Sequence, residues 1–248
     1  MTFTPQVLTD CRIYFASLDA TGYGNKVELD PTVEDLDKTT FGSGGWHERT
    51  GGLFDSQVSA TVFWQAGDLS QPDDVAWAQL GAGTAPLTVV PTSGAVGSLA
   101  YLTQTLETSY KIGADVGKLV SSDITWMGKQ PLARGQVLHP QGTARSSSGS
   151  GTAIQLGAVS ASQRLYANLH VLSVSGGTPS LTVKVQSNVD NTFGAPTDRI
   201  TFTAATGLTS QPSNVLGAVT DTWWRVTWTI SGSTPSFLFA VSAGIAPK

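Results

Sequence analysis

The chain has 248 residues, a formal net charge of −4 and only 13% charged residues, against about 25% in typical soluble domains. This length suffices for two domains, each with its own hydrophobic core. Neither half is basic enough to indicate nucleic-acid binding, and no stretch approaches the ~20 apolar residues of a membrane span. The N-terminus lacks signal-peptide features, and the single cysteine, Cys11, excludes an intramolecular disulfide framework. We therefore expect synthesis in the cytoplasm.

The charge changes sign along the chain. Residues 1–140 contain 15 acidic and 8 basic residues, a net charge of −7, whereas residues 141–248 contain 3 and 6, a net charge of +3. A Ser/Gly-rich stretch lies at the boundary. This pattern predicts two β-rich domains, residues 1–142 and 153–248, joined by a linker at residues 143–152.

The first predicted strand begins near Lys26, and we expect Pro31 to interrupt it because proline cannot donate a ladder hydrogen bond. The acidic stretch Asp30–Asp37 follows. It lacks the glycine and terminal glutamate of an EF-hand loop, so a solvated acidic face is the better interpretation. Thr39–Trp46 is rich in glycine and predicts a loop that carries a tryptophan.

Two long strands are predicted in the first half, at residues 54–66 and 99–110, with a helix between them. In the first strand Val58, Ala60, Val62 and Trp64 share one face and small polar residues share the other, as expected of an antiparallel strand that covers a core on one side. The helix is Gln71–Leu80, with Ser70 as its expected N-cap and Gly81 as its stop. It is expected to present Ala76, Trp77 and Leu80 on one side.

The second half alternates short apolar strands with turn signals, which is typical of a β-sandwich. Two similar segments, Ser175–Pro179 and Ser231–Pro235, are predicted to be chain-reversing turns. Strands at residues 165–171, 181–185, 200–204, 224–230 and 237–241 surround them. The expected fold class is therefore mainly β, with a sandwich or barrel domain carrying one short helix, followed by an antiparallel β-sandwich of Ig-like or jelly-roll type.

Signals of enzymatic chemistry are weak in this sequence. His47, His139 and His170 lie far apart without metal-ligand spacing, and one cysteine cannot form a zinc site. The glycine clusters lack the Lys-Ser/Thr of a phosphate-binding loop, and there is no GxSxG motif. We therefore expect no enzyme, no catalytic residue, no metal site and no cofactor.

Trp223 and Trp224 are consecutive, so an alternating strand must direct them to opposite faces. We expect Trp224 to join Val226 and Trp228 in the core. Trp223 remains as the candidate exposed aromatic residue of the C-terminal domain, for an interface or for stacking on a sugar.

An ordered pattern in residues 27–66 carries a resemblance to a known family. An amphipathic strand, the acidic stretch, Thr39-Thr-Phe-Gly-Ser-Gly-Gly-Trp-His-Glu-Arg49, Gly51-Gly52 and an alternating strand follow one another, and a short helix comes next. This order resembles the major tail tube proteins of long-tailed, siphovirus-like phages of actinobacteria. Residues 152–245, including Leu156-Gly-Ala-Val-Ser-Ala and Asp221-Thr-Trp-Trp-Arg-Val, resemble β-sandwich modules appended to such proteins.

The resemblance implies a structural virion protein, synthesised in the host cytoplasm, that assembles into stacked hexameric rings around a DNA channel. Its implied partners are further copies of itself, the tape measure protein, tail tip or terminator proteins, DNA that passes without specific binding and, for the second domain, host-surface glycans, with no membrane insertion. The candidate lumen-facing residues are Gln57, Ser59, Thr61, Gln65, Thr103, Thr105 and Glu107. The candidate inter-subunit loop comprises Asp35, Asp37, Phe41, Trp46, Glu48 and Arg49.

Several alternatives stay open on the sequence. The acidic residues of the first half can line the channel or the outer surface, and Trp46 can form an interface or cap its own core. The second domain can decorate the tube or serve as a passive spacer. The whole chain could instead be a receptor- or carbohydrate-binding minor tail protein, or a trimeric capsid decoration protein.

Overall fold

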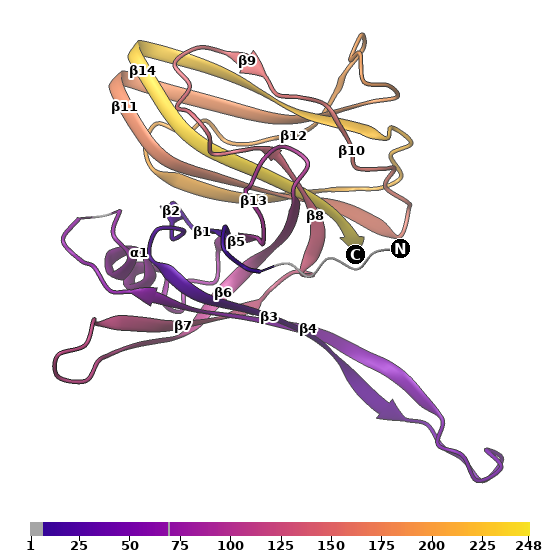
Figure 1. Cartoon of the computed structure of the whole chain (residues 1–248). Helices are drawn as coiled ribbons and strands as arrows, with labels where there is room; N and C mark the ends of the chain where they lie inside the picture. The colour runs from indigo at the N-terminus through magenta and orange to yellow at the C-terminus, as the bar shows by residue number, and fades with distance from the viewer. Residues whose placement is uncertain (1–6, 69) are drawn as a thin grey trace.

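The computed structural model describes residues 7–68 and 70–248; residues 1–6, on which the expectation of no signal peptide partly depends, lie outside the described residues. The fold is mainly β, as predicted, and α1 is the one α-helix in the described parts of the chain. The named strands pair antiparallel, and they join into one continuous network of sheets (Figure 1).

The first half is built from two groups of strands that share β6. One group has the order β2-β1-β5-β6-β8 and the other the order β3-β4-β7-β6. Their core contains Phe15, Val58, Leu87 and Trp126, all nearly inaccessible to solvent. The bounds are β1 Arg12–Phe15, β2 Leu18–Asp19, β3 Gly24–Asp37, β4 Arg49–Phe63, β5 Ala85–Val90, β6 Leu99–Gly113, β7 Ser121–Gly128 and β8 Ala133–His139.

Pro31 does not interrupt β3, contrary to the prediction. It pairs with Ser56 in the middle of the β3–β4 ladder. Within the described residues β3 pairs with β4 alone, so its other edge is free. A proline without an N–H is tolerated on such an edge.

The helix α1 spans Pro72–Gln79, within the predicted range, but two details of the prediction are wrong. Gln71 is the N-cap and no side chain caps the helix, because the Ser70 hydroxyl donates to Asp68 instead. The buried side consists of Pro72, Val75 and Ala76. Trp77 and Leu80 are exposed.

The second half is organised by two very long strands, β11 (Gln163–Asn188) and β14 (Trp223–Pro247), which pair along their whole length. The sequence predicted chain-reversing turns at Ser175–Pro179 and Ser231–Pro235, and this prediction is wrong. The two segments lie opposite each other in the ladder, where the register shifts and both strands bend (Figure 1). The bend lets one strand pair contribute to both sheets of a sandwich.

Glycine is required at this bend. Gly176 and Gly232 have φ values of 113° and 128°, which side chains other than glycine rarely adopt. A Cβ on Gly176 would lie 2.7 Å from the Thr234 carbonyl oxygen, and one on Gly232 would lie 2.9 Å from the Thr178 carbonyl oxygen. The two similar segments are therefore the two sides of one corner.

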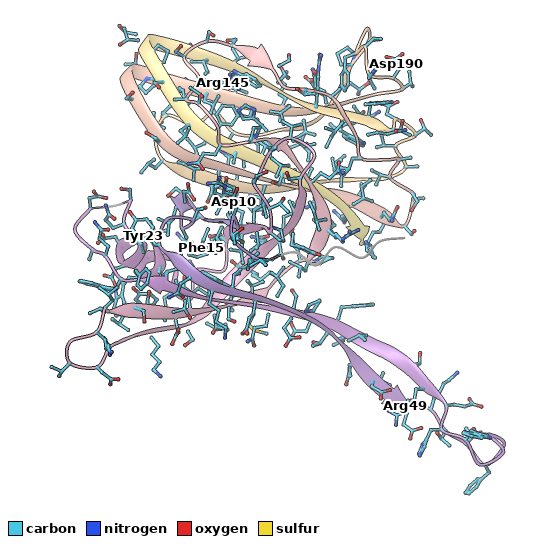
Figure 2. The ribbon with its side chains drawn as sticks, in the orientation of Figure 1. Asp10, Phe15, Tyr23, Arg49, Arg145 and Asp190 are labelled. Atoms are coloured by element: carbon cyan, nitrogen blue, oxygen red, sulfur yellow. The ribbon has the colours of Figure 1, made fainter. Side chains whose placement is uncertain are left out.

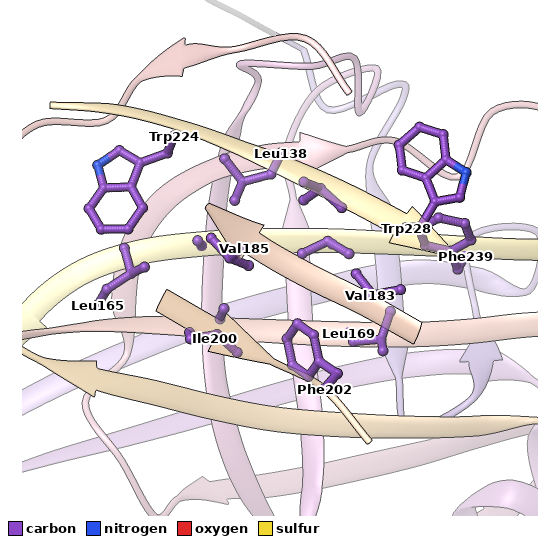
Figure 3. Close-up of a cluster of buried hydrophobic side chains, with 14 of the residues drawn as sticks. Leu138, Leu165, Leu169, Val183, Val185, Ile200, Phe202, Trp224, Trp228 and Phe239 are labelled. Atoms are coloured by element: carbon purple, nitrogen blue, oxygen red, sulfur yellow. The ribbon is translucent and has the colours of Figure 1, made fainter. Parts of the chain in front are cut away.

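Shorter strands complete the sandwich around a dense core (Figure 3). Trp224, Val226 and Trp228 are buried in it, as the alternation predicts, together with Phe237 and Phe239. The additional strands are β9 Gly149–Ser150, β10 Ile154–Gln155, β12 Thr197–Thr201 and β13 Thr209–Leu216. The stretch predicted as a linker includes β9, which pairs with β14, and Arg145, whose backbone bonds to that of Phe237 in both directions.

The two halves are joined by sheet pairing and by buried polar contacts. Strand β14 pairs with β8 from Val241 to Gly244. The Asn168 side chain donates to the carbonyl oxygens of Leu87 (3.0 Å) and Thr103 (3.2 Å). The ring of His170 lies 2.9 Å from the Thr88 hydroxyl through Nε2 and 2.7 Å from the Ala16 carbonyl through Nδ1. These contacts fix one half against the other.

Candidate assembly surfaces

The most prominent feature of the surface is a long β-hairpin that extends away from the body (Figure 1). Strand β7 accompanies β4 only from Gln57 to Phe63. Beyond this point β3 and β4 continue alone, from the Pro31–Ser56 pair to the Asp37–Arg49 pair. We call residues 31–56 the arm. An isolated two-stranded hairpin is at best marginally stable, and beyond its base the arm has no third strand beside it among the described residues.

Apolar side chains on the arm are exposed to solvent. Trp46 is 81% exposed, Phe54 is 86% exposed and Phe41 is fully exposed. Val33, Leu36 and Leu53 are exposed as well. Trp46 therefore does not cap the core of its own half, which was one of the two interpretations of this residue. Several exposed large apolar residues on one element make the arm a candidate interaction surface.

Polar contacts shape the tip of the arm. The carboxylate of Asp37 accepts the Thr39 N–H (2.8 Å) and contacts Nδ1 of His47 (3.1 Å). The hydrogen bonds from Thr39 lower the pKa of Asp37. Arg49, labelled in Figure 2, forms an ion pair with Asp35 across the two strands. Lys38 and Glu48 form a longer pair at 3.9 Å.

The structure thus gathers all the residues of the predicted inter-subunit loop on the arm. The charged members, Asp35, Asp37, Glu48 and Arg49, form the ladder and ion pairs at its far end, and the aromatic members lie in the connecting loop. Gly44 and Gly45, with positive φ, allow the loop to turn tightly and leave Phe41 and Trp46 exposed.

A second surface is the polar outer face of β3, β4, β7 and β6. Gln57 is exposed on this face, and Ser59 and Thr61 are partly exposed. The Thr61 hydroxyl donates to Asp123 (2.7 Å) and that of Ser59 to Glu28 (3.4 Å). Gln65 is exposed but lies just beyond the end of β4. The alternation of β4 is as predicted for Val58, Ala60 and Val62, which are buried beneath this face. The prediction is wrong for Trp64, which lies beyond the end of β4 and is exposed.

The predicted lumen residues of β6 lie elsewhere. Thr103, Thr105 and Glu107 are 3% exposed or less, so they belong to the interior and do not extend the polar face. The hydroxyl of Thr103 donates to the Gln130 carbonyl (2.9 Å) and that of Thr105 to the Ala85 carbonyl (3.0 Å). Backbone acceptors inside the fold thus satisfy the polar groups that suggested a solvated face.

Glu107 is the one acidic residue among the buried polar residues of the described chain. Its carboxylate oxygens have no hydrogen-bond partner within residues 7–68 and 70–248. Burial raises its pKa from 4.5 to about 8, and the side chain of its cross-strand neighbour Trp126, which lies near the carboxylate without forming a well-aligned hydrogen bond, offsets this only in part. The carboxyl group is therefore largely protonated near neutral pH.

Trp223, the candidate exposed aromatic of the second half, is half-buried at the start of β14. It pairs with Asn188 of β11 and with Gln155 of β10. Strand neighbours therefore flank it on both sides.

Sequence reasoning missed the joint of the two halves and a pocket lined by His139 and Arg145. The joint pairs residues about eighty positions apart, such as Thr88 and His170. The pocket lies against the stretch that was interpreted as a linker. The sequence did contain a signal for both features, because His139 and His170 lie on apolar strands and a buried histidine needs partners for its ring nitrogens.

Within the described residues, few features indicate a membrane protein, a metalloprotein or a thiol enzyme. In the described parts of the chain no helix is long and apolar enough to cross a membrane. Residues 7–68 and 70–248 contain no group of three or more His, Cys, Asp or Glu side chains that could hold a metal ion. Burial and the neighbouring Asp10 raise the pKa of Cys11 to about 11, so its thiol is not activated as a nucleophile.

No family model matches the sequence, and no curated protein matches it significantly. The virion of a native gene transfer agent particle contains a similar chain, with 17% identity, a TM-score of 0.42 and coverage of 52% of this chain and 98% of that chain. The SPP1 Dit protein, described as a hub adsorption apparatus of phages that infect Gram-positive hosts, has 10% identity, a TM-score of 0.35 and coverage of 95% and 99%. A chain of the phage p2 baseplate has 10% identity, a TM-score of 0.37 and coverage of 96% and 98%. These neighbours are components of phage tails, baseplates and related particles, and at these scores the similarity identifies no family for this chain.

Proposed function

We propose that the chain is a structural subunit of a phage tail that self-assembles into stacked hexameric rings, and that these rings form a tube through which DNA passes. The observation that carries the proposal is the arm, which holds exposed aromatic residues away from the core of its own chain. The tube and the six-fold symmetry come from the sequence resemblance and are part of the proposal.

The arm supports self-assembly for an energetic reason. Burying a large apolar side chain stabilises a protein or complex by about 2–3 kcal/mol, and Phe41, Trp46 and Phe54 are all exposed on the free chain. A neighbouring copy that covers these residues would remove three large aromatic side chains from solvent and support the two-stranded hairpin at once. The arm reaches well beyond the body (Figure 2), so the covering copy can belong to the next ring.

The polar face supports the role of a channel wall. Lys26 lies 3.0 Å from Glu28 on β3, and Lys111 is the cross-strand neighbour of Asp123. The cations of this face are thus accompanied by carboxylates. DNA binding strengthens with each phosphate that a cation neutralises, so such a wall would not retain passing DNA. Gln57, Ser59, Thr61 and Gln65 are the residues that we propose to line it.

The second half would then lie on the outside of the tube, fixed to the wall domain by the joint at Asn168 and His170. Other tail components, such as tape measure, tail tip and terminator proteins, would contact the rings. The rival function, a receptor-binding minor tail protein, would not need an arm that joins identical subunits.

Electron microscopy of the purified chain at high concentration, with and without a tail-initiation complex as seed, tests the proposal. Striated tubes or six-fold rings are the expected result. Stable monomers or trimers in the presence of the seed would contradict it.

A further inference from the structure

A pocket of about 320 Å³ lies in the second half, between the end of β8 and the stretch at residues 145–152. This volume is within the range of small-molecule sites, at its lower end. His139, Arg145 and Trp228 line it together with Val96 and the hydroxyl-bearing residues of the stretch. The pocket is independent of the arm and of the proposed channel wall.

Two side chains of the pocket have unsatisfied polar atoms. His139 is 2% exposed, and its Nε2 has no hydrogen-bond partner in the described parts of the chain; the same holds for Nε of Arg145. The imidazole stacks on Phe239 with ring centroids 4.3 Å apart, which fixes its orientation. Buried polar atoms usually have partners, so two orphaned atoms beside one pocket point to a ligand that supplies them.

The charge of the pocket is positive. The guanidinium of Arg145 lies 5.4 Å from the centroid of the Trp228 ring, and none of the lining residues is acidic. Arg145 forms no ion pair within residues 7–68 and 70–248. An arginine with a free fork favours an oxyanion such as a carboxylate or a phosphate.

The Ser/Gly stretch also lines the pocket. A Cβ on Gly149 would lie 2.9 Å from Cζ2 of Trp228, so glycine allows β9 to lie directly against the indole. The indole N–H donates to the Ser147 carbonyl (3.0 Å). This packing holds the lining residues Ser147 and Thr152 at the pocket, where their hydroxyls can bond to hydroxyls of a ligand. The hydroxyl of Ser150 donates instead to that of Thr227 (3.4 Å).

We propose that this pocket binds an acidic sugar, with Arg145 on its carboxylate or phosphate group and His139 and the serine and threonine hydroxyls on its ring hydroxyls. A cation, a buried imidazole and a wall of hydroxyls match an anionic, polyhydroxylated ligand better than an apolar one. The composition of residues 146–152 then follows from the site, because glycine gives close approach to Trp228 and serine and threonine give hydroxyls.

Saturation-transfer NMR on the full chain tests the proposal, with glucuronate, glucose 6-phosphate and glucose as probes at millimolar concentrations. We expect saturable signals from at least one of the two acidic sugars and weaker signals from glucose. The ratio of the two acidic sugars distinguishes a carboxylate site from a phosphate site. Arg145→Gln should reduce the affinity at least about tenfold.

The matched control is Arg225→Gln. Arg225 also lies over an aromatic ring in the second half, 4.3 Å from the centroid of Phe193, but it is not part of the pocket. Its variant should bind as the original chain does. If Arg145→Gln fails to fold, His139→Phe keeps an aromatic ring on Phe239, removes Nε2 and should also weaken binding. Equal binding of glucose and the acidic sugars, no saturable signal, or unchanged binding in the Arg145 and His139 variants would overturn the proposal.

Discussion

The two halves of the chain differ in how completely they bury their own apolar residues. In the second half Trp224, Trp228, Phe237 and Phe239 form a closed core, and the large apolar residues exposed there are Val189, Leu208 and Leu216. The other exposed large apolar residues of the described chain lie in the first half, many of them on the arm. Similar residue types therefore have two fates: the second half buries them in its own core, whereas the first half leaves many of them on its surface, where we propose that other subunits cover them.

Topology explains the difference. The corner at Gly176 and Gly232 folds one strand pair over itself, so that both sheets of the second half face a common core. The β3–β4 pair has a register shift between Val33 and Asp35 but does not fold back over itself, and it runs past the end of β7. A hairpin that extends from the body in this way exposes both of its faces to solvent or to a partner.

The strongest way to sharpen this comparison is to truncate one tryptophan in each half. Trp224→Ala should lower the free energy of unfolding by about 3–5 kcal/mol, because it leaves a cavity in a closed core. Trp46→Ala should change it by less than about 0.5 kcal/mol, because the side chain is exposed on the free chain. Urea denaturation of the unassembled chain measures both, and equal losses would contradict the division of roles.

The corner gives a second prediction. Gly176→Ala should destabilise the chain by about 1–3 kcal/mol through its positive φ and through the clash with the Thr234 carbonyl. Gly207→Ala is the matched control, since a Cβ there meets nothing within 4 Å, and it should be nearly neutral. Thermal melts of the two variants make the test; indistinguishable melting temperatures would refute the requirement for glycine at the corner.

The joint gives a third prediction. Asn168→Ala leaves the buried carbonyls of Leu87 and Thr103 without this donor, which should cost about 1–3 kcal/mol. Because the lost contacts cross between the halves, we expect calorimetry to show a broadened or divided transition. A single transition with unchanged midpoint would mean that the sheet pairing of β8 and β14 suffices to couple the halves.

The raised pKa of Glu107, a residue of the first half, predicts that the free energy of unfolding depends on pH. Its pKa is raised from 4.5 to about 8 by burial, so its contribution to stability is fully present below pH 4.5 and is lost as the pH rises toward 8. The slope is at most about 1.4 kcal/mol per pH unit. Relative to Glu107→Gln, the original chain should become less stable between pH 5 and 8. Urea midpoints measured at several pH values test this, and parallel curves for the two proteins would contradict it.

The sequence predicted those elements in which alternation and burial agree. Strand β4 is the clearest case, with Val58, Ala60 and Val62 inside and Gln57, Ser59 and Thr61 outside. Strand β6 misled the prediction, because Thr103 and Thr105 satisfy their hydroxyls on backbone carbonyls in the interior. Polarity alone does not distinguish a solvated face from an internally bonded one.

Long-range features could not be predicted in the same way. The corner depends on two glycine segments meeting across the β11–β14 ladder, and each segment alone has the composition of a turn. The pocket at Arg145 depends on a loop folding back onto Trp228, eighty residues later in the chain. A single sequence contains these residues but not their pairing.

The most direct test of the central claim is sedimentation velocity over a range of concentrations, comparing the original chain with the double variant Phe41→Ser, Trp46→Ser. Both substitutions lie on exposed positions of the arm and should leave the fold intact. We predict ring-sized species for the original chain at high concentration and monomers for the variant. Identical assembly of both proteins would show that the arm does not join the subunits.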